Sequence, residues 1–146
     1  MKNFFNRLLL LLFFVTFGCS VKNVPYYTPD NMEPFHISNI AQYIAPEIAD
    51  VISEKQTIFK FKGNDIFLNA LSMELQGLGY GTKFSNQDIE TTSSEALNVT
   101  YTIDWIGADR FYTVVNLGEK NRITKLFCID NGSVTPENQT ILGGAK

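Results

Sequence analysis

Apolar residues recur at helical spacing over residues 37–53. They follow one another at steps of three and four, which is the spacing of one face of an α-helix. The residues of this face are Ile37, Ile40, Ile44, Ile48 and Val51. Pro46 interrupts the pattern, because proline lacks a backbone donor and crowds the preceding turn. Either the helix kinks at Pro46, or a second short helix begins there with proline at its first position.

A second helical pattern covers residues 66–80, with Asn64 and Asp65 in front of it. Its apolar stripe consists of Phe67, Leu71, Leu75 and Leu78, with Ala70 beside them. Either Asn64 or Asp65 is suitably placed to cap the first turn. Gly77 and Gly79 supply the C-terminal stop.

Elsewhere apolar and polar residues alternate, which is the period of a half-buried β-strand. The alternation is clearest from Leu97 to Trp105, where apolar and aromatic residues occupy one face and Asn, Thr and Asp the other. The further predicted strands are residues 57–61, 80–84, 110–117 and 122–129. The tail that follows Asp-Asn-Gly-Ser at 130–133 is expected to be loosely held at its end.

The order of these elements predicts an α+β fold. A strand–helix–strand unit followed by antiparallel hairpins would form a small two-layer domain, with helices packed on one face of a mixed, mainly antiparallel sheet. The polar positions of the strands are rich in Thr and Asn. The other face of the sheet is therefore expected to meet water or a partner.

The N-terminus has the pattern of a secretory signal peptide. Lys2 and Arg7 precede an uncharged apolar run at residues 8–18, which ends in the small residue Gly18. This run is shorter than the roughly 20 apolar residues that a membrane-spanning helix needs. A basic start, a short apolar core and a small residue at the cleavage site are typical of a signal peptide. We therefore predict that residues 1–18 are removed.

The residue after the predicted cleavage site is Cys19, and Thr-Phe-Gly-Cys at 16–19 resembles the lipobox of bacterial lipoproteins. Gly18 and Cys19 fit that motif, whereas Leu is usual in place of Thr16 and Ala or Ser in place of Phe17. An acylated Cys19 would anchor the chain in lipid, and Ser20 at the next position favours the outer membrane over the inner one. The alternative is an ordinary signal peptide followed by a chance cysteine.

Lipidation of Cys19 would also decide the state of Cys128, the other cysteine. A sulfur in a thioether to diacylglycerol cannot form a disulfide, so Cys128 would remain unpaired. An exposed thiol is a liability in an oxidising compartment. We therefore expect Cys128 to be buried as a small hydrophobic residue.

Residues 19–35 are predicted to be an extended tether, and residues 36–146 the periplasmic domain. The tether contains Pro25, Pro29 and Pro34 and no helical period, and proline favours extended conformations around it. It is either a passive spacer or a binding segment. The second interpretation rests on Tyr26 and Tyr27, because aromatic side chains are enriched at protein interfaces.

Charge argues against direct binding of nucleic acid. The formal net charge is −3, and it becomes about −5 once Lys2 and Arg7 leave with the signal peptide. No basic block stands out in the sequence. A surface that binds phosphates needs clustered Lys and Arg.

The residues that carry chemistry form no catalytic or metal-binding pattern. His36 is the one histidine and has no ligand-type neighbour at a suitable spacing, so we expect a structural role at the start of a helix. The glycines at 77–81 follow a helix instead of opening one, unlike a phosphate-binding loop. Asp104 and Asp109 have no base beside them in sequence. We therefore predict no enzyme activity, no cofactor and no metal.

The segment Gly-Asn-Asp-Ile-Phe-Leu-Asn-Ala-Leu-Ser-Met-Glu-Leu-Gln-Gly-Leu-Gly-Tyr, followed by Leu-Asn-Val-Thr-Tyr-Thr-Ile-Asp, resembles the TrbH lipoproteins of conjugal transfer systems. The resemblance covers about residues 45–141. The matching positions are Gly63, Phe67, Ala70, Leu71, Leu75, Gly79, Tyr80, Tyr101, Ile103 and Asp104.

The resemblance implies a non-catalytic component of a type IV secretion, or mating-pair formation, apparatus. Such a lipoprotein would be anchored in the outer membrane through Cys19, would carry its domain in the periplasm and would hold channel subunits of the secretion complex in place. The alternative function is a pilot or accessory lipoprotein of a secretin or of an outer-membrane assembly machine.

Overall fold

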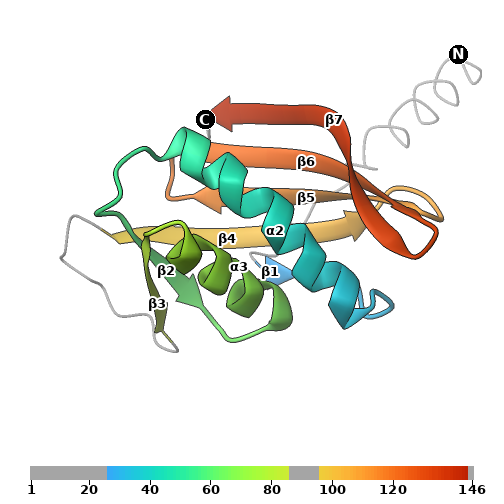
Figure 1. Cartoon of the computed structure of the whole chain (residues 1–146), viewed down its shortest axis with the longest axis horizontal. Coiled ribbons are helices and arrows are strands. Elements are labelled where there is room, and N and C mark those ends of the chain that lie inside the picture. Colours follow the sequence, from blue (N-terminus) through green and yellow to red (C-terminus); the bar gives the residue numbers. More distant parts are fainter. Residues whose placement is uncertain (1–25, 86–95, 145–146) are drawn as a thin grey trace, which may run out of the picture.

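The computed structural model describes residues 26–85 and 96–144, which form two helices and one mixed sheet. Both helices lie on the same side of the sheet (Figure 1). The predicted two-layer α+β fold is therefore confirmed, with the core between the helical layer and the sheet. The predicted signal peptide, Cys19 and the polar segment 86–95 lie outside the described residues.

Six strands lie side by side in the order β3-β2-β4-β5-β6-β7, and the short β1 pairs with β4. The pairs β1–β4, β2–β3 and β2–β4 are parallel, whereas β4, β5, β6 and β7 form antiparallel pairs. The strands are β1 (Tyr26–Tyr27), β2 (Ile58–Lys62), β3 (Gly81–Ser85), β4 (Ala96–Trp105), β5 (Arg110–Leu117), β6 (Asn121–Asp130) and β7 (Ser133–Gly144).

The first predicted helix is α2 (Pro34–Val51), and it continues through Pro46 as one element. Pro46 cannot donate to the carbonyl of Gln42, one turn earlier. Both residues are exposed, so water can satisfy that carbonyl. The buried face extends across the proline, and this explains why no second helix begins there. Its residues are His36, Ile37, Ile40, Ala41, Ile44, Ala45 and Ile48.

Polar and aromatic contacts hold α2 on the antiparallel part of the sheet. Lys125 of β6 is only 9% exposed and forms an ion pair with Glu47 of α2. The ring of Tyr43 packs against Phe127, with ring centroids 6.0 Å apart. At the other end of α2, His36 Nε2 lies 3.0 Å from the carbonyl oxygen of Gly132 in the β6–β7 turn. His36 therefore has a structural position at the start of the helix.

The second helix, α3 (Ile66–Gly77), connects the adjacent parallel strands β2 and β3. Asp65 caps it, because its Oδ1 accepts a hydrogen bond of 2.8 Å from the backbone N–H of Leu68. Gly79 follows the helix with φ at +89°, a conformation that favours glycine. Leu78, predicted on the apolar stripe, is 39% exposed because it stands at the C-cap beyond the buried face.

Aromatic rings fill much of the core. The rings of Phe111 and Phe127 stack at 5.3 Å with an interplanar angle of 11°, and Trp105 meets Phe111 edge-on at 5.5 Å. Phe67 of α3 packs on Tyr101 of β4 with centroids 4.4 Å apart. These contacts join residues from both parts of the sheet to the helical layer.

The predicted loose tail is part of the sheet. From Ser133 to Gly144 it forms β7 and pairs with β6, with an irregularity between Lys125 and Phe127. Asn131 and Gly132 connect the strands with φ of 51° and 76°, which matches a two-residue hairpin turn. Pro136 is compatible with this position because β7 is an edge strand.

The folded domain also begins earlier than the predicted boundary at His36. β1 pairs with β4, and Pro29 and Met32 are buried. The second half of the predicted tether is therefore part of the domain. The prolines of this segment do not prevent it from joining the sheet, because only Tyr26 and Tyr27 pair with β4 and neither is a proline.

Candidate binding surfaces

The N-terminal arm, residues 26–33, contains both tyrosines of the predicted binding segment. The register of β1 places Tyr26 opposite Tyr101 and Tyr27 opposite Thr102, so their backbones pair with β4 of the same chain. Binding of a partner by these tyrosines remains a prediction.

A relay of hydrogen bonds fastens the arm to α3. The hydroxyl of Tyr101 donates to Asp65 Oδ2 at 2.9 Å, and the other oxygen of Asp65 caps the helix. Thr28 Oγ1 lies 2.9 Å from the Tyr101 hydroxyl. Because Tyr101 uses its proton on the carboxylate, Thr28 donates in this pair. One tyrosine thus connects the arm, β4 and the start of α3.

A second group of contacts fixes the arm at the end of β4. The indole N–H of Trp105 donates to Asn31 Oδ1 at 2.9 Å. Met32 is 5% exposed and belongs to the core, and its N–H closes a turn on the carbonyl of Pro29 at 3.1 Å. The arm therefore packs along β4 from Tyr101 to Trp105.

The arm shares one edge of β4 with β2. Phe61 is the last residue of β2 paired with β4, opposite Val99, and Tyr26 lies opposite Tyr101. The two parallel strands thus follow each other along the same edge, because β5 occupies the other edge of β4. The partner of Tyr26, Tyr101, lies two residues beyond Val99, and Lys62 is the last residue of β2.

The sheet face turned away from α2 and α3 is called the outer face. Successive side chains of a strand point to opposite faces of the sheet. The residues of the outer face are therefore those that alternate along each strand with residues buried against the helices. Thr and Asn occupy its centre, where Asn116 Nδ2 donates to Thr100 Oγ1 at 3.0 Å. Among the described residues, its charged side chains are the cations Lys60, Lys62, Lys83, Arg110 and Arg122 and the acids Asp104, Asp130 and Glu137.

Cys128 lies on this outer face and is half-buried, so the expectation that it is buried in the core is wrong. The preceding residue, Phe127, faces the core with no exposed surface, and the next residue of a strand points the opposite way. The sulfur of Cys128 lies 3.2 Å from Thr135 Oγ1 of β7. The side chain of Cys128 thus packs against the neighbouring strand β7 on the outer face.

An ion pair crosses β6 at one end of the outer face. The Nε and Nη2 of Arg110 donate to the two carboxylate oxygens of Glu137, each at 2.7 Å. The hydrogen bond from the guanidinium and its positive charge lower the pKa of Glu137, and the same contact raises the pKa of Arg110. This pair joins β5 to β7 beside the irregular part of the β6–β7 pairing.

The helical side of the molecule is acidic. Its acidic residues within the described ranges are Glu33, Glu47, Asp50, Glu54, Asp65 and Glu74. Its cations in those ranges include Lys55, which lies over the ring of Tyr80 at 4.0 Å, and Lys125, which is 9% exposed and paired with Glu47. The two faces of the domain therefore differ in charge.

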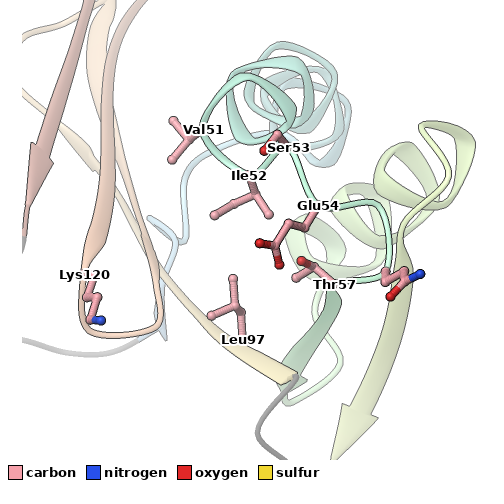
Figure 2. A pocket seen from close by; sticks show the side chains of 8 residues that line it. Val51, Ile52, Ser53, Glu54, Thr57, Leu97 and Lys120 are labelled. Carbon is pink, nitrogen blue, oxygen red and sulfur yellow. The ribbon is translucent and has the colours of Figure 1, made fainter.

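A groove of about 530 Å³ opens between the end of α2, the following loop and the β5–β6 turn. Figure 2 shows Val51, Ile52 and Leu97 as apolar lining, with Glu54 near the loop and Lys120 on the opposite turn. Ser53, Gln56 and Thr57 complete the lining. The lining of the groove thus combines apolar side chains with one acid and one base.

The residues considered for catalysis do not come together. His36 is at the opposite end of α2 from the groove, about 24 Å away at 1.5 Å per residue. Asp104 Oδ1 accepts from the N–H of Trp105 at 2.8 Å, and Asp109 is exposed in the β4–β5 connection. Within residues 26–85 and 96–144, no three His, Cys, Asp or Glu side chains form a cluster suited to a metal ion.

The helices in the described part of the chain are also too short or too polar to span a membrane.

Comparison with known proteins identifies a family. Residues 21–143 match the family model of the conjugal transfer protein TrbH. The match begins before the N-terminal arm and includes both helices and nearly all of β7. No curated protein and no solved structure matches the chain significantly. Because the family model matches most of the sequence, the chain belongs to the TrbH family of conjugal transfer proteins.

Proposed function

We propose that this protein is a non-catalytic, lipid-anchored component of a conjugative type IV secretion system that stabilises the outer-membrane core complex. Membership of the TrbH family supports a role in conjugal transfer. The sequence Gly18-Cys19 after a signal-type segment supports acylation of Cys19. In this proposal the domain lies in the periplasm and contacts channel subunits, without binding the transferred DNA.

The observation that carries the proposal is the attachment of the N-terminal arm to the sheet. Tyr26 follows Cys19 by seven positions in the sequence. The distance between their Cα atoms is therefore about 25 Å at most, when the chain is fully extended. This is about half the reach of a tether that extends to residue 35. An acylated Cys19 would therefore hold the domain close to the membrane surface, where its concentration near a membrane-embedded channel is high.

The surfaces of the domain favour a binding role over a catalytic one. The groove combines apolar residues with Glu54 and, on the opposite turn, Lys120 (Figure 2). We propose that this groove and the acidic helical side bind channel subunits of the secretion complex.

The lipid anchor is tested by metabolic labelling with palmitate in cells that carry the conjugative system. We expect the wild-type chain to be labelled, and Cys19→Ala to be unlabelled and recovered as a soluble or unprocessed form. Cys128→Ser is the matched control and should remain labelled, because Cys128 belongs to the folded domain. Labelling of Cys19→Ala would contradict the proposed anchor.

The role in the secretion complex is tested by purifying the labelled protein from detergent extracts and identifying the proteins that accompany it. We expect channel subunits of the secretion system, and a loss of conjugation in a deletion strain. Normal conjugation without any recovered channel subunit would refute the role. Recovery of a secretin would instead favour the pilot lipoprotein, which is the alternative function.

Simultaneous replacement of Tyr26→Ala and Tyr27→Ala tests whether the tyrosines bind a partner. The main chain makes the pairing with β4, so we expect domain stability to change little. Weaker assembly of the secretion complex would support a binding role for the two side chains. Unchanged assembly would mean that this segment only connects the anchor to the domain.

A further inference from the structure

Positive charge on the outer face is concentrated on the part of the sheet where the N-terminal arm enters. Lys60 and Lys83 are paired across β2 and β3, and Lys62 precedes the position of Tyr26 on the same edge of β4. Arg122 of β6 lies opposite Asn116 of β5, which in turn lies opposite Thr100 of β4, so the three residues form one row across the sheet. Of the acids of this face, Asp104 and Glu137 accept hydrogen bonds from Trp105 and Arg110 on the other part of the sheet, and Asp130 ends β6 on that same part.

The helical side of β4 is covered next to the position of Tyr26. Along the edge of β4, β2 pairs as far as Val99, two residues before Tyr101, the partner of Tyr26. On the helical side, Phe67 covers Tyr101 with ring centroids 4.4 Å apart, and Asp65 binds the Tyr101 hydroxyl. Figure 1 shows both helices on that side. The outer face of the sheet carries neither helix.

The short connection to Cys19 brings the outer face within range of membrane charges. Its length of about 25 Å is an upper limit for a fully extended chain. The connection contains Lys22 and no acidic residue. Charges act over about 8 Å at physiological ionic strength, so a sheet face that lies on the bilayer would sense anionic headgroups.

We propose that the outer face of the sheet lies on the anionic surface of the membrane, with the exposed Lys83 and Arg122 directed toward lipid headgroups. This proposal rests on the proposed acylation of Cys19. The acidic helical side and its groove then face away from the membrane, where they are accessible to subunits of the secretion complex. The lipid thus determines the orientation of the domain as well as its location.

The orientation is tested with fluorescent labels on the mature, lipidated protein in vesicles of phosphatidylethanolamine and phosphatidylglycerol. The labels are attached at Asn98→Cys on the outer face and at Met73→Cys on α3, each combined with Cys128→Ser. Both positions are exposed. With a nitroxide on the lipid headgroup, we expect strong quenching at position 98 and weak quenching at position 73.

The charges are tested with Lys83→Glu and with the matched control Lys55→Glu, which makes the same charge change on the helical side. Each cation near an anionic surface contributes about a fivefold factor to association. Lys83→Glu should therefore shift the ratio of membrane-contacting to free orientations by at least about fivefold, seen as lost quenching at position 98. Lys55→Glu should leave the quenching unchanged, and neutral phosphatidylcholine vesicles should abolish the difference between the two variants.

The outcomes separate this proposal from the one on which it rests. A mature chain without lipid on Cys19, seen by its mass, would overturn both. A lipidated chain with equal quenching at positions 73 and 98, or with stronger quenching at 73, would overturn the orientation and leave the proposed function intact. Equal effects of Lys83→Glu and Lys55→Glu would overturn the role of the outer-face charges.

Discussion

The two halves of the sheet are stabilised in different ways. In the antiparallel half, β4 and β6 are ten residues long and β5 is eight, and the rings of Phe111 and Phe127 stack beneath α2. In the parallel half, β2 and β3 have five residues each and β1 has two. The strands β2 and β3 of this half pack on α3 through fully buried residues such as Phe59 and Leu71, whereas the two-residue β1 is fastened by the hydrogen bonds of Tyr101.

This difference matters because the N-terminal arm joins the molecule through its parallel half. Regions with short strands and few buried apolar contacts open locally at a lower free energy than the core. We therefore expect the arm and β3 to exchange their amide hydrogens faster than β5 and β6. The predictions below test this contrast, from the largest expected effect to the smallest.

Phe127→Ala should cause the largest loss of stability. The side chain has no exposed surface, stacks on Phe111 and contacts Tyr43 of α2. Truncation of a buried phenylalanine typically costs about 3–5 kcal/mol. Urea denaturation followed by circular dichroism should show one transition at a much lower midpoint. A change below about 1 kcal/mol would contradict the assignment of this stack to the core.

Leu71→Ala tests the parallel half in the same way. Leu71 of α3 is fully buried, and its truncation should cost about 2–5 kcal/mol. Met73→Ala is the control on the same helix, because Met73 is 73% exposed. The urea midpoint should fall for Leu71→Ala alone. Equal midpoints for the two variants would mean that α3 does not pack on the sheet as described.

Tyr101→Phe removes the hydroxyl that links Thr28 to Asp65. Loss of such hydrogen bonds costs about 1–3 kcal/mol when a partner is left unsatisfied. The effect should be local, so hydrogen exchange should accelerate in residues 26–33 and in the first turn of α3, and not in β5 or β6. Tyr112→Phe on the outer face is the control. Unchanged exchange in the arm would show that the relay does not hold it.

Thr113→Val should stabilise the protein slightly. Thr113 is fully buried in β5, and its hydroxyl has no hydrogen-bond partner among the described residues. Valine has nearly the same shape without the unsatisfied oxygen, so a gain on the order of 1 kcal/mol is expected in urea denaturation. A loss of stability would indicate that the hydroxyl has a partner in the folded protein.

The smallest effect concerns the ion pair of Arg110 and Glu137. The pKa of Glu137 is lowered in the folded state from the usual 4.5 by its contact with Arg110. The contribution to stability is therefore present above pH 4.5 and is lost as the pH falls through the folded-state pKa. Because Arg110 is exposed and Glu137 is only half-buried, solvent screens the pair and the loss should be slight.

Glu137→Gln should remove that part of the pH dependence of stability, as measured by urea denaturation at a series of acidic pH values. At neutral pH, Glu137→Gln should change the free energy of unfolding by close to zero. A profile that is unchanged by Glu137→Gln would show that this pair does not contribute.

Much of the fold could be predicted from local patterns. Leu71 and Leu75 mark the buried face of α3, and Asp65 caps that helix. The alternation in β4 gives the correct orientation of Val99 and Ile103 toward the core. These elements are readable because one face of each is apolar and the other polar.

The elements that were not predicted depend on tertiary contacts or on ambiguous patterns. β1 has two residues, and it exists because the edge of β4 beyond Val99 is available to it. β7 contains Pro136 and no clear alternation, although Asn131-Gly132 is a hairpin signal. In β6, Leu126 to Ile129 is apolar on both faces, so the sequence did not reveal which way Cys128 points.

The candidate binding surfaces, too, could be predicted from the sequence only where they depend on local patterns. Cys19 is identified by its place after an apolar segment, which is local information. The groove and the cationic outer face unite residues such as Leu97 and Lys120, or Lys83 and Arg122, which are far apart in sequence. Only the order and register of the strands bring them together.

Mass spectrometry of the mature N-terminal peptide tests most directly whether a lipid on Cys19 holds this domain at the membrane. The account predicts that the peptide begins at Cys19, with diacylglycerol on its sulfur and an acyl chain on its amine. A free thiol at position 19, or a disulfide between Cys19 and Cys128, would contradict it.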